Sequence, residues 1–107
     1  MTYNEAIQTL ESQLKNWESM IAEPNGVFSK SEITRMFKNN SSSAIANGIN
    51  AIRKAVEETC NKVNVLTMME SKIPHESHIT NLKRRFTNNE KHFLSMIDLM
   101  EEWKNVR

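Results

Sequence analysis

The 107-residue chain has few residues that break helices, since it contains two glycines and two prolines. A β-sandwich needs turn residues roughly every 8–12 positions, so this composition excludes most folds built from many short strands. The single cysteine, Cys60, cannot form a disulfide within the chain and suits a reducing compartment. We therefore expect a single domain over residues 1–107 of the all-α class.

Long hydrophobic runs and an excess of one charge are also missing. The longest apolar candidate, over residues 63–69, is far shorter than the roughly 18–20 residues that a membrane span requires. The first residues have neither a basic region nor an apolar stretch, so we expect no secretory signal. The formal net charge of +1 argues against a dedicated nucleic-acid-binding domain, and we expect no nucleic acid among the partners.

The sequence does contain three stripes of apolar residues spaced three and four positions apart, as on one face of a helix. They predict helices over about residues 3–22, 31–71 and 75–104. Each helix has one apolar face to bury, which predicts an antiparallel three-helix bundle, up-down-up, with coiled-coil-like packing. The expected core and structural residues are Ile7, Leu10, Leu14, Trp17, Ile21, Ile45, Ile49, Ile52, Val56, Val63, Leu66, Ile79, Leu82, Phe86, Phe93, Met96, Met100 and Trp103.

The ends of the first helix follow from local signals. Thr2 is the expected N-cap, with Glu5 three residues later, and the helix must end before Pro24. In the turn that follows, Gly26 can take a positive φ. Because the first and third helices run parallel in this bundle, we expect Trp17 and Trp103 to share an aromatic cluster at one end.

The second helix contains a polar stretch of poor helix formers at residues 38–43. Either one helix of about 40 residues passes through this stretch, or two helices meet there. We favour one helix, because the stretch has no proline or glycine and the apolar pattern resumes nearly in phase. Such a helix would extend beyond the first helix and offer a surface to a partner. Gly48 within it would admit a close neighbour or a bend.

No motif points to catalysis or to a bound cofactor. The two glycines lie 22 residues apart and cannot form a phosphate-binding loop. The acidic pairs at residues 57–58 and 101–102 point to different helix faces, so neither is an acid/base dyad. His75, His78 and His92 lack the further ligands that a metal site needs. We expect no catalytic, cofactor-binding or metal-ligating residue.

Three further features have a structural and a functional interpretation. Lys83, Arg84 and Arg85 are the densest positive cluster; a solvated helix face is favoured over a surface for an acidic partner or anionic lipid. Cys60 lies near the apolar stripe and is expected to be a small buried hydrophobe. Asn89 is the polar member of the third stripe, and we expect it to be at least partly buried, hydrogen-bonded and able to set helix register.

The order of several segments is also characteristic. Leu-Lys-Asn-Trp-Glu-Ser-Met-Ile at 14–21 precedes a Glu-Pro turn at 23–24 and a capped Ser-Glu-Ile start at 31–33. The second helix continues through 55–65, and the third contains Leu-Lys-Arg-Arg-Phe-Thr within 79–87. This order resembles the N-terminal domain of the syntaxin-6 group of SNARE proteins.

The resemblance covers most of residues 3–103 and implies an antiparallel three-helix regulatory domain without enzymatic activity. It implies a role in vesicle trafficking and membrane fusion between endosomes and the Golgi, through contacts with other SNARE proteins or tethering factors. It also implies residence on the cytosolic face of those membranes. The fusion-driving SNARE motif and the C-terminal anchor are absent, so we expect a monomeric fragment that would reach a membrane only through that anchor.

The alternative is a small bacterial helical partner protein, such as a secretion-associated or immunity protein of about this length. The secretion substrates with a Trp-x-Gly turn fit less well, because Gly26 follows Pro24 and Asn25. A small enzyme or metal-binding bundle is the least favoured hypothesis. A histidine-dependent zinc or iron site in equilibrium dialysis would restore it.

Overall fold

The structure is a computed structural model that describes residues 2–38, 41–73 and 77–106. Helices account for 88% of these described residues and no strand occurs among them, which confirms the predicted all-α class. None of the helices in these ranges is both long and apolar enough to cross a membrane. The helices are α1 (Tyr3–Ile21), α2 (Lys30–Phe37), α3 (Ser42–Lys72) and α4 (Ser77–Val106).

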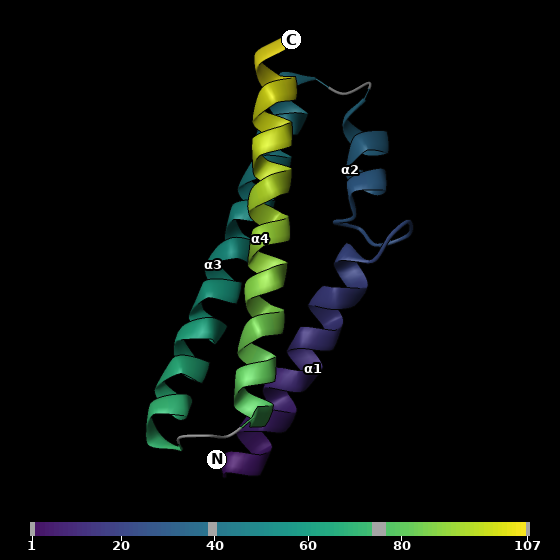
Figure 1. Ribbon diagram of the computed structural model, residues 1–107. Coiled ribbons are helices and arrows are strands. Elements are labelled where there is room, and N and C mark those ends of the chain that lie inside the picture. Colours follow the sequence, from purple (N-terminus) through teal and green to yellow (C-terminus); the bar gives the residue numbers. More distant parts are fainter. Residues whose placement is uncertain (1, 39–40, 74–76, 107) are drawn as a thin grey trace.

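The two longest helices, α3 and α4, lie side by side in opposite directions along a molecule of 49 × 22 × 21 Å. Figure 1 shows α1 running in the direction of α4 along the lower half of this pair. Above it, α2 continues along the same side, next to the upper half. The α1 helix packs mainly against α4, and α1 and α3 scarcely touch. The third side of the pair is therefore covered by two helices in succession.

The prediction of one continuous helix over 31–71 is wrong. The first piece, α2, ends at Phe37, and α3 begins at Ser42 after a new N-cap. Ser41 has an extended backbone with φ of −75° and ψ of 164°, and its hydroxyl accepts a hydrogen bond from the Ala44 amide at 3.3 Å. Serine favours such caps because its side chain replaces the missing helical hydrogen bond. The expected overhang is consequently not bare, since α2 folds back onto it.

The predicted limits of the first helix agree with the structure, and the turn that follows it contains Gly26. The amide of Glu5 donates to the Thr2 hydroxyl at 3.2 Å, as the capping box predicts. Gly26 does not use the positive φ that is open to a glycine, since no described glycine has one. Gly26 is instead needed for close approach: a Cβ there would lie 2.3 Å from the carbonyl oxygen of Met20. The turn thus folds tightly onto the end of α1.

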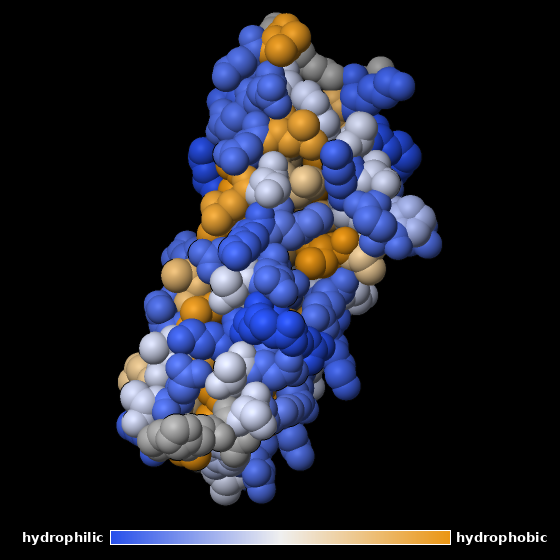
Figure 2. Space-filling view, viewed as in Figure 1, coloured by the Kyte–Doolittle hydropathy of each residue, from blue (hydrophilic) through white to orange (hydrophobic). Residues whose placement is uncertain are grey.

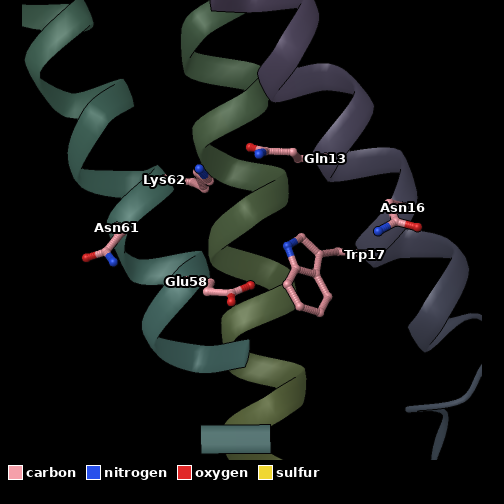
Figure 3. A pocket seen from close by; sticks show the side chains of 6 residues that line it. All are labelled: Gln13, Asn16, Trp17, Glu58, Asn61 and Lys62. Carbon is pink, nitrogen blue, oxygen red and sulfur yellow. The ribbon is translucent and has the colours of Figure 1, made fainter. Parts of the chain in front are cut away.

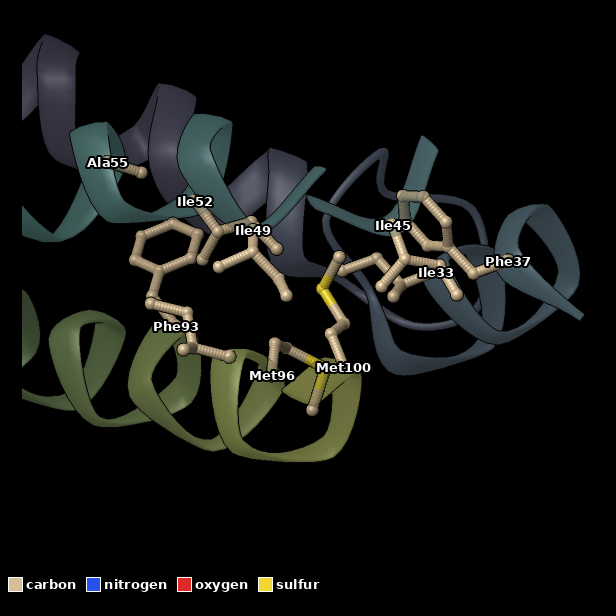
Figure 4. Packing of buried hydrophobic residues seen from close by; sticks show 10 residues of the cluster. Ile33, Phe37, Ile45, Ile49, Ile52, Ala55, Phe93, Met96 and Met100 are labelled. Atoms are coloured by element: carbon tan, nitrogen blue, oxygen red, sulfur yellow. The ribbon is translucent and has the colours of Figure 1, made fainter. Parts of the chain in front are cut away.

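The core consists of two clusters. The upper cluster joins α2, α3 and α4 (Figure 4), and the lower cluster joins α1, α3 and α4. The upper residues are Ile33, Phe37, Ile45, Ile49, Ile52, Ala55, Phe93, Met96, Ile97 and Met100. The lower residues are Ile7, Leu10, Leu14, Leu66, Ile79, Leu82 and Phe86. The other predicted core residues are partly buried at the edges of these clusters: Trp17, Ile21, Val56, Val63 and Trp103.

The two tryptophans do not share an aromatic cluster. Trp17 packs against Phe93 and Phe28, with ring centroids 5.4 and 6.5 Å apart. Trp103 instead lies near Phe37 of α2. The expectation was wrong because α1 is much shorter than α4, so that their late residues lie at different levels.

A polar layer separates the two clusters. Thr59 of α3 and Asn89 of α4 are both buried, and each lies along its helix between residues of the upper and lower cluster. The Thr59 hydroxyl donates to the Ala55 carbonyl at 2.8 Å. The predicted burial of Asn89 is confirmed, since it is 3% exposed. The predicted hydrogen bond is not found at its Nδ2, which has no partner among the described residues.

Gly48 provides the space in which α2 meets α3. A Cβ at this position would lie 2.2 Å from Cζ of Phe37 and 2.8 Å from Cε of Met100. Real Cβ atoms do not come this close to a neighbour, so any other residue would displace the Phe37 ring. The close neighbour predicted for Gly48 is therefore Phe37.

Gly48→Ala should lower the free energy of unfolding by about 1–3 kcal/mol, the usual cost of overpacking. In an exposed helix the same change would raise it by about 1 kcal/mol, so the sign is diagnostic. Urea denaturation of the single variant and of Gly48→Ala combined with Phe37→Leu measures the effect. Because the smaller side chain relieves the clash, the pair should be less than additive. Stabilisation by Gly48→Ala alone would contradict the packing of Phe37 on Gly48.

Asn89→Leu should raise the free energy of unfolding by about 1–3 kcal/mol, because it removes a buried amide nitrogen without a partner. Leucine has the same branching as asparagine, which limits the change in shape. Urea denaturation gives the stability, and light scattering gives the mass, because a polar residue in a helical seam can also set the oligomeric state. A loss of stability at unchanged mass would mean that Nδ2 has a partner in solution.

Candidate functional site

An apolar groove lies between α2 and the last turns of α4. It has a volume of about 350 Å³ and is lined by Thr34, Phe37, Lys38, Trp103 and Val106. In Figure 2 a large hydrophobic area lies at this upper end of the molecule, next to the helix of the C-terminal residues. Elsewhere on this face the hydrophobic side chains form smaller spots among hydrophilic ones. The groove is the apolar concave surface that we take as the candidate binding site.

The walls of the groove are held by the upper core cluster. Phe37 is buried against it, and Trp103 packs against its edge while remaining partly accessible. Val106 is 86% exposed at the rim. Aromatic side chains are enriched at protein interfaces because they bury a large area with few rotatable bonds. A partly accessible tryptophan beside an exposed valine is thus suited to receive an apolar side chain of a partner.

The position of α2 depends on the turn before it. The hydroxyl of Ser29 caps α2 by accepting from the Glu32 amide at 3.1 Å. The Glu23 carboxylate accepts from the hydroxyl of Ser31 at 2.5 Å and from its amide at 3.4 Å. The carbonyl of Phe28 lies 2.9 Å from Nε2 of His92 on α4. These contacts join the start of α2 to the end of α1 and to α4.

The basic cluster that the sequence suggested as a partner surface does not form one surface. Lys83 turns to α3, where its Nζ lies 3.4 Å from Oε1 of Glu70. Arg85 turns to α1 and donates to both oxygens of Glu18, at 3.0 and 2.5 Å. These hydrogen bonds raise the pKa of Arg85 above its usual value. Arg84 points outward and donates to Asn81 at 2.7 Å.

Two histidines join α4 to other parts of the chain, and none is part of a metal-binding group in the described ranges. His78 pairs with Glu11 of α1 at 2.5 Å, and His92 contacts the Phe28 carbonyl. His75 lies outside the described residues. Cys60 is exposed, so its predicted burial is wrong. Its neighbour Thr59 takes the inward position in that turn of the helix.

The groove was missed by sequence reasoning because its residues were assigned to one long helix. The signal that could have found it is the run Asn-Asn-Ser-Ser-Ser at 39–43, whose side chains favour turns and caps over helix interiors. A break there allows Phe37 to turn back towards α4. Without that break, Phe37 and Trp103 have no reason to lie together.

Comparison with protein-family models, with curated proteins and with solved structures finds no match to this chain. Its function is therefore inferred from the residues and their geometry.

The contact between Glu23 and Ser31 should be visible in a titration. The hydrogen bond from the Ser31 hydroxyl lowers the pKa of Glu23 below its ordinary value. A lowered pKa in the folded state means that this contact stabilises the fold above the unfolded-state pKa and is lost as the pH falls through the folded-state pKa. Side-chain carboxyl NMR should show this low pKa, and Ser31→Ala should move it up towards the ordinary range. An unchanged Glu23 pKa in the variant would contradict the contact; Ser19→Ala, on the exposed face of α1, is the control.

Proposed function

We propose that this chain is a non-catalytic protein-interaction domain that binds an apolar segment of a partner in the groove between α2 and α4. The observation that carries the proposal is the apolar lining of the groove, in which Phe37 is the buried wall, Trp103 is partly accessible and Val106 is exposed. Apolar concave surfaces of this kind commonly receive one face of an amphipathic helix.

The narrower form of the proposal follows from the resemblance to the N-terminal domain of the syntaxin-6 group. In this form α1 and α2 together take the place of the first helix of an antiparallel three-helix bundle. The domain would regulate SNARE assembly or bind tethering factors during membrane fusion between endosomes and the Golgi, on the cytosolic face of those membranes. The support is the order of the segments at 14–21, 23–24, 31–33 and 79–87.

If the groove is the binding site, one substitution at its rim should weaken the binding of a partner helix. Purified chain should bind at least one member of a panel of fluorescent SNARE-motif and tethering-factor helices, measured by anisotropy. Val106→Glu should weaken that binding by about tenfold or more, because it places a charge against the apolar anchor. Val106 is 86% exposed, so the variant should keep its fold, which circular dichroism checks.

Val65→Glu is the matched control, since Val65 is also exposed but lies on α3 away from the groove. It should bind like the parent chain. Equal binding by the Val106→Glu variant would overturn the groove as the site. Binding to none of the panel helices would overturn the narrower SNARE form.

A further inference from the structure

A second concave surface lies between α1 and α3, on a different part of the molecule from the apolar groove. Both helices pack against α4 but scarcely against each other, which leaves a cleft of about 440 Å³. Clefts of roughly 300–1,000 Å³ are the usual size for small-molecule sites. Figure 3 shows the side chains that line it, which are Gln13, Asn16, Trp17, Glu58, Asn61 and Lys62.

The cleft contains one negative and one positive side chain that do not pair with each other. Glu58 and Lys62 lie four residues apart on α3, in the order that favours an ion pair on a helix surface. Within the described ranges, neither makes a hydrogen bond or an ion pair. In Figure 3 the Lys62 amino group extends towards Gln13, whereas the Glu58 carboxylate points towards Trp17. Two opposite charges are thus presented to the cleft about one helical turn apart.

Two groups of α1 complete the lining. The side-chain oxygen of Gln13 is buried and has no hydrogen-bond partner among the described residues. A buried acceptor without a donor costs free energy, which a ligand with an N–H donor can recover. Trp17 presents its indole ring from the same side, and Figure 3 shows the indole nitrogen facing the Gln13 and Lys62 end of the cleft. The indole N–H can only donate.

We propose that this cleft binds a small zwitterion of the α-amino acid class. Its carboxylate accepts from Lys62 and the Trp17 indole N–H. Its ammonium donates to Glu58 and to the buried oxygen of Gln13. An apolar side chain of the ligand lies on the Trp17 ring. The matched charges of Glu58 and Lys62 select against ligands of a single charge, because such a ligand leaves one of them without a partner.

Binding would also have a mechanical effect on the fold. The ligand would contact two residues of α1 and two of α3. These two helices otherwise share few contacts. It would therefore tie α1 to α3 as well as to α4. This site does not depend on the proposed function of the apolar groove, since the two surfaces share no residue.

The chain has two tryptophans, so Trp103→Phe leaves Trp17 as the only indole reporter in the cleft. Its fluorescence is titrated with each of the common L-amino acids up to about 10 mM, a range that covers millimolar affinity. For L-leucine the matched analogues are isoamylamine, which lacks the carboxylate, and 4-methylpentanoate, which lacks the ammonium. We expect a saturable change with at least one apolar amino acid. The matching single-charge analogues should bind at least about tenfold more weakly.

Glu58→Gln and Lys62→Met, each in the Trp103→Phe chain, should each weaken binding by about tenfold. The controls Glu57→Gln and Lys54→Met remove like charges from exposed positions of α3 outside the cleft and should leave binding unchanged. The absence of a saturable change with any amino acid would overturn the proposal. Equal binding of the single-charge analogues, or unaltered binding by both cleft variants, would also overturn it.

Discussion

The long antiparallel contact between α3 and α4 is the interaction on which the other features of this structure depend. The two helices have 31 and 30 residues, which at 1.5 Å per residue gives each a length of about 45 Å. A pair of this length presents an apolar face far longer than α1, with its 19 residues, can cover. Because uncovered apolar surface is unfavourable in water, the remaining length needs a second covering element. The short helix α2 supplies it with Ile33 and Phe37.

Because α1 and α2 together cover one side of the α3–α4 pair, their positions determine where the surface has a groove or a cleft. The pieces meet at the turn around Gly26, which folds tightly onto α1 and carries Phe28 to the aromatic contact with Trp17. Below this turn, two side-chain contacts link α1 to α4: Glu18 forms an ion pair with Arg85, and a carboxylate oxygen of Glu11 lies next to Nε2 of His78. Because α1 packs mainly against α4, its α3 side remains open as the cleft.

Much of this arrangement could be predicted from the sequence, and the part that could not has a definite physical cause. The stripe of Ile7, Leu10 and Leu14 is buried as expected, because a helix with one apolar face can be placed in a core without knowledge of its neighbours. The break after Phe37 was missed because the deciding interaction is the cap at Ser41. A cap of this kind is worth only about 1 kcal/mol and competes with a continuing apolar pattern. Its position determined the groove, so the groove was missed as well.

The contacts of individual charged side chains could not be predicted from the sequence either, because they depend on residues of other helices. Lys83 and Arg85 look like one basic cluster in the chain. On the helix they are separated by about 200° of rotation and pair with acidic residues of two different helices. In the sequence, Glu58 and Lys62 look like an ordinary surface pair on one helix. In the structure both line a cleft, because α1 and α3 do not pack against each other. In both cases the spacing along the helix determines the direction in which a side chain points. The neighbouring helix then determines which residues that side chain contacts.

The polar layer of Thr59 and Asn89 also links the packing of the core to the two surface sites. It divides the core into an upper part that holds α2 and a lower part that holds α1. Because each short helix has its own apolar cluster, a change in one cluster acts first on the helix it holds. Phe37 and Trp103 couple the groove to the upper cluster, whereas Trp17 lies against both clusters and lines the cleft. A ligand that shifts Trp17 would therefore act on α1 directly and would reach the groove through Phe28 and Phe93, which both contact the Trp17 ring.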